Sequence, residues 1–216
     1  MNTLAEENYL KSIYHLSENE ESVSTNQLAA LLNTKASSVT DMLKKLSDKC
    51  LINYTPYQGV SLTVQGEKIA VNIIRKHRLW EFFLVEKLNF KWDEVHEMAE
   101  EMEHISSNEL IDRLDQFMDF PKYDPHGDPI PDRNGLFKTN NLKPVSSIGV
   151  NECGVICGVR DHSSAYLQYL EKQSLVIGKK IMVAEIIGFD HSMILQTEDK
   201  MIQISREVAN NLLIAL

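Results

Sequence analysis

The sequence predicts a mainly α-helical protein that ends in a small β domain. Apolar residues recur every three to four positions through the first 120 or so of the 216 residues, as in amphipathic helices. A stretch rich in Pro, Gly and Asn, "FPKYDPHGDPIPDRNGLFKTNNLKP", follows and favours a loop and a linker. From about Val145 short β-type segments succeed one another. We therefore expect domains over residues 1–65, 66–131 and 145–216, with a linker over 132–144.

The first domain has three predicted helices and a hairpin. The first helix begins near Leu4, and Ser24 or Thr25 can cap a second, "TNQLAALLN". After a short turn, "SSVTDMLKKLSDKCLI" carries one apolar face, and "NYTPYQGVSLTVQG" has the composition of two paired strands. This order is the outline of a winged helix-turn-helix, in which the last helix lies in the major groove of DNA.

The polar face of that last helix supplies candidate DNA contacts. Small polar side chains at its start would meet base edges, lysines behind them would meet phosphates, and the hairpin tip would form the wing. The candidates are Ser37, Ser38, Thr40, Asp41, Lys44, Lys45, Lys49, Tyr57 and Gln58. A helical bundle without a nucleic-acid partner has the same outline and stays open.

A net charge of −9 is unfavourable for binding DNA, but the charge is unevenly distributed along the chain. Residues 1–78 hold nine Lys and Arg against eight Asp and Glu, whereas residues 79–120 hold three against twelve. The N-terminal third is therefore free to face phosphates.

The middle domain is expected to contain a helix from Gly66 to about Asn89 and another from Trp92 to Ile105. Ser106 and Ser107 then form an interruption and an N-cap for a third helix over "NELIDRLDQFM". His77 and Glu81 lie one turn apart on the first of these. On the second, one face carries four possible ligands: His96, Glu100, Glu103 and His104.

Clustered carboxylates repel one another, and burial adds a further cost that a divalent cation would remove. A metal site is one interpretation, and a solvated acidic helix face is the other. There is no Ser/His/Asp arrangement, no His-Glu-x-x-His pattern and no glycine-rich phosphate loop, so we expect no enzyme. A metal-dependent hydrolase and a winged-helix protein whose acidic middle binds a protein partner without metal are the alternatives.

The C-terminal segment has four β-type stretches, "IGVNECGVICGV", "KKIMVAEIIGF", "SMILQT" and "KMIQIS", with a helical "SSAYLQYLEKQ" after the first. This spacing predicts a small barrel of roughly five strands. The N-terminus lacks a signal peptide, no run is long enough to span a membrane, and three cysteines form an odd set. We expect a cytoplasmic protein with no membrane partner.

The chain resembles the diphtheria-toxin-repressor/manganese-repressor (DtxR/MntR) family over nearly its whole length. The resemblance is carried by the winged helix and by the segments "IIRKHRLWEFFL", "VHEMAEEMEHISSNELIDRL" and "HGDPIP". Its core pattern, R-K-H-R-x-x-E followed by H-x(6)-E-H-x-x-S, is specific. The resemblance implies a homodimer in which metal fixes the first helix relative to the middle helices. Operator DNA is then bound, and metal-uptake genes are repressed. It also implies an SH3-like, ferrous-transport-A-type (FeoA-type) C-terminal domain.

Two metal sites per subunit follow from the resemblance. The primary site would use Asn8, Glu100, Glu103 and His104, and the ancillary site His77, Glu81 and His96. Asp161 occupies the place where C-terminal domains of the family add a carboxylate, and Asp124 and His126 match further ligands of the longer manganese sensors. Oxygen-rich ligands suit Mn²⁺ and also accept Fe²⁺. We expect manganese in preference to iron, although Asn8 would add no charge.

Overall fold

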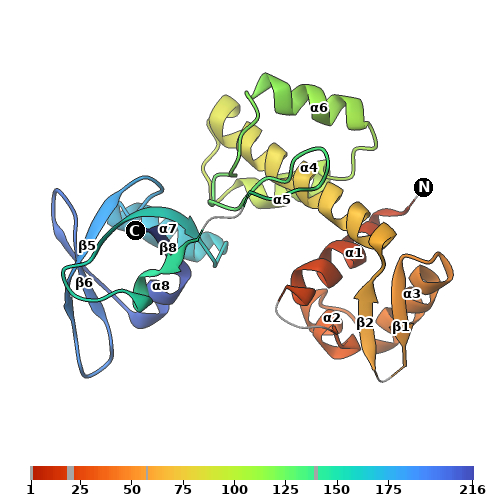
Figure 1. Ribbon diagram of the computed structural model, residues 1–216, viewed down its shortest axis with the longest axis horizontal. Helices are drawn as coiled ribbons and strands as arrows, with labels where there is room; N and C mark the ends of the chain where they lie inside the picture. The colour runs from red at the N-terminus through yellow and green to blue at the C-terminus, as the bar shows by residue number, and fades with distance from the viewer. Residues whose placement is uncertain (1, 19–21, 57, 139–140) are drawn as a thin grey trace. The chain divides into compact units, whose positions relative to one another are not determined.

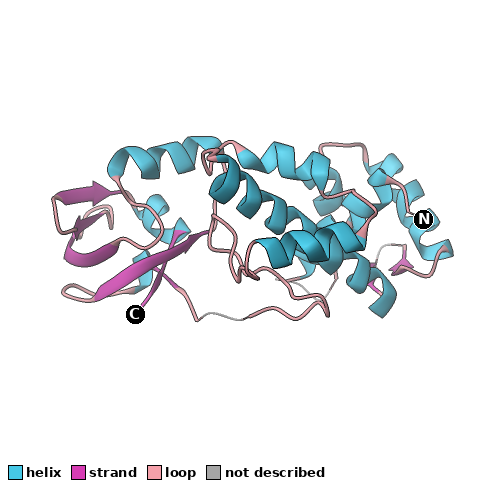
Figure 2. Ribbon diagram, turned by 90° about the horizontal axis from the view of Figure 1, so that it is seen from above, coloured by secondary structure: helices cyan, strands magenta, loops and turns pink. Residues whose placement is uncertain are grey.

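The structure is a computed structural model that describes residues 2–18, 22–56, 58–138 and 141–216 (Figure 1). It confirms a mainly helical chain with a C-terminal β domain, and its strands gather in two places (Figure 2). Two compact units make up the chain. The first comprises Met1–His77, Glu100–Arg113 and Pro131–Leu136, and the second comprises Arg78–Ala99, Leu114–Ile130 and Phe137–Leu216.

The first unit contains the predicted winged helix-turn-helix. Its elements are α1 (Leu4–Ser17), α2 (Thr25–Leu31), α3 (Ala36–Asp48), β1 (Ile52–Thr55) and β2 (Gly59–Leu62). Ser24 caps α2 by accepting a hydrogen bond from the backbone N–H of Gln27, as its position predicts. Leucines from all three helices share one core, among them the fully buried Leu10, Leu28 and Leu43.

The hairpin of the wing is antiparallel, with Ile52 paired to Leu62 and Thr55 to Gly59. Gly59 has a φ of +93°, and a Cβ there would lie 2.1 Å from the Ser22 hydroxyl oxygen. Glycine is therefore required at this position. Tyr57, one of the two residues predicted at the wing tip, lies outside the described residues.

Three helices contribute residues to both units: α4 (Val64–Leu88), α5 (Val95–Met102) and α6 (Asn108–Phe117). The predicted helix from Trp92 to Ile105 is wrong at both ends. Residues 92–94 form a turn, and 103–104 form another turn that carries two of the candidate ligands. Ser107 caps α6, as predicted, by accepting from the N–H of Leu110.

The C-terminal domain of the second unit has a single sheet in the order β3-β8-β4-β5-β6-β7. Its strands are β3 (Lys143–Pro144), β4 (Cys153–Val159), β5 (Lys180–Ile186), β6 (Met193–Gln196), β7 (Met201–Ile204) and β8 (Leu212–Ala215), and η1 (Val145–Ser147), α7 (Ser164–Gln173) and α8 (Arg206–Asn211) complete it. All the pairings are antiparallel. The four predicted segments are strands. The sheet has six strands and not roughly five, because the residues of β8 pair with β3 on one side and β4 on the other.

The loop before the C-terminal domain is fixed against β4. Gly127 has a φ of +90°, and a Cβ there would lie 2.0 Å from the carbonyl oxygen of Cys157, so the backbone approach requires glycine. The N–H of Val159 donates to the carbonyl of His126 at 3.0 Å. The loop and the sheet therefore hold one another in a fixed register within the second unit.

Candidate metal centres and DNA interface

Glu103 is the centre of a polar cluster in the first unit. Its side chain is fully buried, and its two oxygens lie 2.7 and 2.9 Å from Nζ of Lys11. His77 Nδ1 lies 2.6 Å from Oε2. Burial alone would raise the pKa of Glu103, but the hydrogen bond from His77 and the charge of Lys11 hold it below its ordinary value. Glu103 is therefore a carboxylate at neutral pH.

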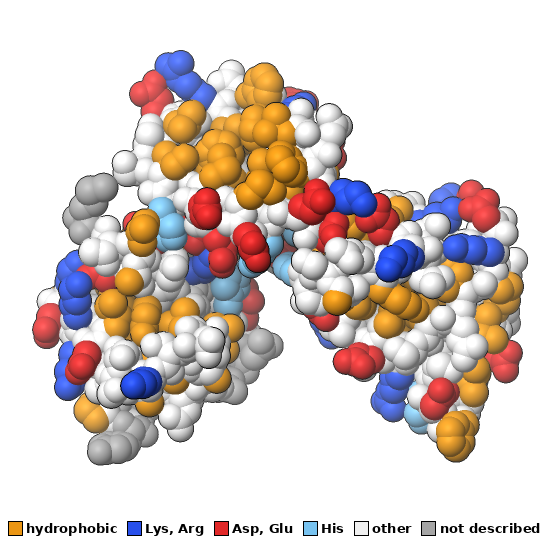
Figure 3. Space-filling view, turned by 180° about the vertical axis from the view of Figure 1, so that it is seen from behind, with side chains coloured by type: hydrophobic (Ala, Val, Ile, Leu, Met, Phe, Trp, Pro, Cys, Tyr) orange, Lys and Arg blue, Asp and Glu red, His pale blue; other side chains and the backbone are white. Residues whose placement is uncertain are grey.

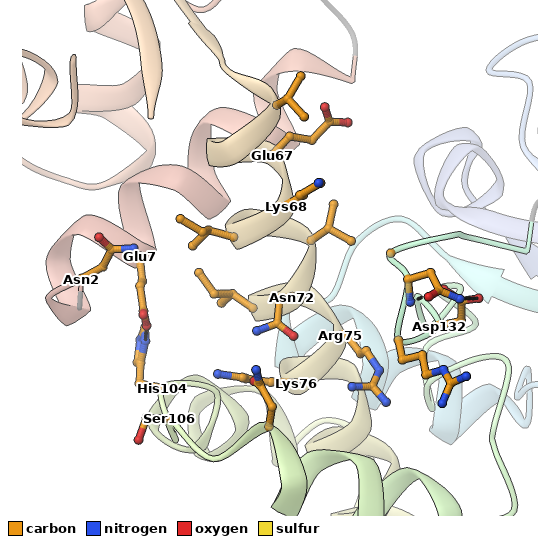
Figure 4. A pocket seen from close by; sticks show the side chains of 18 of the residues that line it. Asn2, Glu7, Glu67, Lys68, Asn72, Arg75, Lys76, His104, Ser106 and Asp132 are labelled. Atoms are coloured by element: carbon orange, nitrogen blue, oxygen red, sulfur yellow. Dashed lines mark hydrogen bonds and ion pairs between the residues drawn. The ribbon is translucent and has the colours of Figure 1, made fainter. Parts of the chain in front are cut away.

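His104 joins this cluster to the first helix. Its Nδ1 lies 2.7 Å from Oε2 of Glu7, and its Nε2 lies 3.7 Å from Oε1 of Glu103. Figure 4 shows Glu7 of α1 pointing at His104. The pair lines a cavity of about 1090 Å³ within the first unit, which gives solvent access to this edge of the cluster.

The structure places Glu7, and not Asn8, toward the predicted ligands. Asn8 is exposed. Glu100 lies at the edge of the cluster, with Oε1 3.6 Å from Nζ of Lys11 and a side chain that is 52% exposed. Glu103 and His104 therefore lie together with Glu100 close to them, and Glu7 and Lys11 are additions that the resemblance did not supply.

The orientation of α1 follows from its own sequence. Thr3 and Glu6 form a reciprocal capping box, which fixes the first turn. Glu7 and Lys11 are then one turn apart on the same face. Glu6 faces the other way, fully buried, and accepts from Lys45 at 3.1 Å and Lys49 at 2.8 Å, both on or next to α3. Helix α1 thus contacts the candidate metal cluster on one side and the predicted DNA-reading helix on the other.

A second cluster lies in the second unit, where Glu81, Asp124 and His126 are all buried. Their ligand atoms lie within 4.8 Å of one another. His126 Nε2 lies 2.8 Å from the carbonyl of Trp92, which fixes that nitrogen as the donor. Nδ1 then faces Glu81 at 3.5 Å. It is the ring nitrogen that would bind a metal, once its own proton is lost.

The electrostatics of this second cluster also favour a cation. Burial and the charges of Asp128 and Glu81 raise the pKa of Asp124 to about 7. Burial lowers the pKa of His126, but the neighbouring Glu81 and Asp124 raise it to about 9. The raised pKa of Asp124 reflects its burial among other carboxylates, and a divalent ion bound there would favour its ionised form. The oxygen and imidazole donors of both clusters fit Mn²⁺ or Fe²⁺.

The residues of the predicted ancillary site, His77, Glu81 and His96, have ligand atoms that all lie within 4.8 Å of one another. His77 contacts Glu103 in the first unit, whereas Glu81 contacts His96 at 3.3 Å and His126 in the second. Asp161 is partly exposed and accepts from the backbone N–H of Ser163. Its neighbour His162 is instead stacked on His126, with ring centroids 4.7 Å apart. The family resemblance named Asp124 and His126 as candidate ligands but did not name His162.

The candidate DNA-reading face is exposed as predicted at Ser37, Ser38, Asp41 and Gln58. Thr40 is half-buried, and its hydroxyl donates to the carbonyl of Ala36. The lysines differ from one another, however. Lys44 is 64% exposed beside Asp41, while Lys45 and Lys49 are engaged with the buried Glu6. Lys45 and Lys49 thus have a structural partner that the sequence did not reveal.

Comparison with known proteins agrees with this architecture. Residues 1–60 match the family model of the iron dependent repressor N-terminal DNA binding domain, 63–132 match its metal binding and dimerisation domain, and 143–216 match the FeoA domain. None of the described helices combines the length and apolar composition needed to cross a bilayer.

Two curated relatives and one solved structure illustrate the match. A helix-turn-helix-type transcriptional regulator of Methanocaldococcus jannaschii is 42% identical over 114 residues, which is 52% of this chain and 91% of the relative. The iron-dependent repressor IdeR of Mycobacterium leprae is 32% identical over 133 residues, which is 61% of this chain and 58% of IdeR. A manganese-dependent transcriptional repressor in complex with manganese superposes with a TM-score of 0.86 at 29% identity, covering 97% of this chain and 98% of that one. The chain therefore belongs to the DtxR/MntR family of metal-dependent transcription repressors.

Proposed function

We propose that this chain is a metal-activated, homodimeric repressor that binds operator DNA and controls genes for metal uptake, with Mn²⁺ preferred to Fe²⁺. One observation supports it above the others. Helix α1 is held between the Glu7, Glu103 and His104 cluster and helix α3. A change in how α1 is held at the cluster therefore reaches the DNA-reading helix through Glu6 and its lysine partners.

The primary site is proposed at Glu7, Glu100, Glu103 and His104, with His77 at its edge. A divalent ion there would be bound by the carboxylate oxygens of these residues and a nitrogen of His104. Glu103 is ionised. His104 would bind the metal through a ring nitrogen after its contact with Glu7 is broken. Because ligands come from α1 and from residues 100–104, binding tightens the contact between them within the first unit.

The second site is proposed at Glu81, Asp124 and His126, with His96 beside Glu81. Its ligands come from α4 and from the loop that is hydrogen-bonded to β4. Metal at this site would stabilise the packing of that loop on the C-terminal domain. Asp161 stays a candidate ligand only if the hydrogen bond that it accepts from the backbone N–H of Ser163 is broken.

The homodimer is proposed to form through the apolar surface of the helical domain. Leu88, Phe117 and Phe120 of the second unit are 51%, 68% and 51% exposed. Figure 3 shows hydrophobic side chains gathered into a broad patch on one face of the molecule. Such patches on a protein surface mark interaction sites, and the matched domain is described as one for dimerisation.

The decisive experiment has two stages. Binding sites are first selected from a library of random-sequence DNA duplexes by the full chain in the presence of Mn²⁺. Affinity for the selected duplex is then measured by fluorescence anisotropy with Mn²⁺, with Fe²⁺ under anaerobic conditions, and with EDTA. We expect tight binding with Mn²⁺, weaker activation by Fe²⁺, and loss in EDTA. Equal affinity in all three conditions would contradict metal activation.

A further inference from the structure

Lys11 places its ammonium group against the carboxylates of the first cluster. Its Nζ lies 2.7 and 2.9 Å from the two oxygens of Glu103 and 3.6 Å from Oε1 of Glu100. The Lys11 side chain is only 14% exposed, and that of Glu103 is fully buried. The ammonium therefore contacts both oxygens of the most deeply buried carboxylate among the proposed ligands.

We propose that Lys11 is an internal competitor for the metal ion, so that a divalent cation must displace its ammonium from Glu103 in order to bind. This inference rests on the proposed metal-binding function and adds a residue that sets the affinity. Without metal, Lys11 neutralises Glu103 and keeps α1 attached to residues 100–104. With metal, the same oxygens are needed as ligands.

Lys11 opposes metal binding in two ways. First, both oxygens of Glu103 already accept bonds from Lys11, and Oε2 also contacts His77 at 2.6 Å, so an incoming ion must break at least one strong bond. Second, an ion bound to these oxygens would lie within a few ångströms of the ammonium, and like charges at that distance disfavour each other. Both effects weaken metal binding, so removing the ammonium should strengthen it.

A second lysine–carboxylate pair, Lys49 with Glu6 of α1, provides the control. Lys49 contacts the buried Glu6 at 2.8 Å, and this pair has the same chemistry as Lys11 with Glu103. Lys49 nevertheless lies on the α3 side of α1, away from Glu7 and His104. Replacing either lysine removes a bond to a buried carboxylate, but only Lys11 is expected to influence the metal.

The test uses the full-length chain and the variants Lys11→Met and Lys49→Met. Affinity for Mn²⁺ is measured by competition with a fluorescent chelator, and thermal unfolding is followed in EDTA and in Mn²⁺. Both variants should melt earlier than the wild type in EDTA. Lys11→Met alone should bind Mn²⁺ at least tenfold more tightly and show a larger rise in melting temperature with Mn²⁺.

Unchanged or weaker Mn²⁺ affinity in Lys11→Met would overturn the inference and leave Lys11 as an anchor of α1. That result differs from failure of the proposed function, in which the wild type itself binds neither Mn²⁺ nor Fe²⁺.

A measurement on the wild type covers the case in which Lys11→Met does not fold. Acetylation of lysines by a water-soluble N-hydroxysuccinimide ester is followed by mass spectrometry with Mn²⁺ and with EDTA. Displacement predicts that Lys11 reacts several-fold faster with Mn²⁺, while Lys49 reacts at the same rate in both. An equal or slower reaction of Lys11 with Mn²⁺ contradicts displacement.

Discussion

Glu7 and Asn8 are neighbours in α1, but successive side chains of a helix point about 100° apart, so only one of them faces His104. The structure assigns that position to Glu7, at 2.7 Å, and leaves Asn8 exposed. Glu7→Gln should therefore weaken Mn²⁺ binding about tenfold by removing a charged ligand. Asn8→Ala should change it less than about twofold. Isothermal titration with Mn²⁺ measures both.

The opposite pattern would restore the assignment that the family resemblance suggests. If Asn8→Asp bound Mn²⁺ more tightly and Glu7→Gln bound it normally, then Asn8 would be the ligand from α1. The two assignments differ by a rotation of α1 of about 100° about its axis. These variants therefore also report how α1 is oriented in the metal-bound protein.

Residue spacing could predict part of the candidate site because some of the candidate ligands are close together in the sequence. Glu103 and His104 share a short segment with Glu100 and His96, and their concentration signals a cation. Lys11 and Glu103 are separated by 92 positions, and His126 and Trp92 by 34. Such contacts depend on how helices rotate and where loops return, and a lysine among nine Lys and Arg in the first 78 residues carries no mark of its partner.

Helix α1 is attached to α3 through Glu6, and this contact should contribute measurably to stability. Its carboxylate is fully buried and accepts from Lys45 and Lys49. Hydrogen bonds to a charged group contribute about 1.5–3 kcal/mol, so Glu6→Gln should lower the free energy of unfolding by about 2 kcal/mol. Urea unfolding of both proteins in EDTA at neutral pH measures the difference.

The pH dependence of this effect has a definite sign. Burial raises the pKa of Glu6, but the bonds from Lys49, the Thr3 backbone and Lys45 lower it from 4.5 to about 2. The stabilisation is complete above the unfolded-state value and is lost as pH falls through the folded-state value. The difference between wild type and Glu6→Gln should thus shrink below pH 4.5. A difference that stays constant down to about pH 2.5 would show that the charge of Glu6 is not what stabilises the contact.

On helix α3, Lys44 is the clearest candidate for a phosphate contact. It is 64% exposed, and its pairing with Asp41 at 3.6 Å is loose. Lys44→Ala should weaken binding about equally on all DNA sequences and flatten the slope of log affinity against log salt by about 0.9. Anisotropy titrations over a range of salt concentrations test this. Lys45→Ala is the contrast, because it should also destabilise the fold through Glu6.

Element boundaries show where sequence patterns stop being informative. The order of helices and the wing followed from apolar periodicity, and capping residues placed the starts of α2 and α6. Helix α5 is shorter than its pattern suggested because the turns at 92–94 and 103–104 satisfy local contacts, including Lys91 N–H to Glu94 at 3.1 Å. Strand β8 was missed because its pairing with β3 and β4 joins distant segments.

At the scale of the whole molecule, His126 of the preceding loop joins the C-terminal domain to the proposed second metal cluster. His126 presents Nδ1 to Glu81, and its backbone carbonyl accepts from Val159 of β4. Its ring is also stacked on His162. A ligand that binds the native state stabilises the contacts it depends on, so metal at the second cluster should stabilise the packing of the loop on the sheet.

Hydrogen exchange followed by mass spectrometry measures this connection directly. With Mn²⁺, peptides that contain the amide of Val159 should exchange about tenfold more slowly, since the hydrogen bond to His126 opens less often. Peptides from β7, whose partner in the sheet is β6 alone, should be unaffected and serve as an internal control. Glu81→Gln removes a ligand of the second cluster and leaves Glu103 and His104 in place. It should abolish the slowing at Val159 while keeping Mn²⁺-dependent protection of α1, and slowing that persisted in this variant would place its origin outside the second cluster.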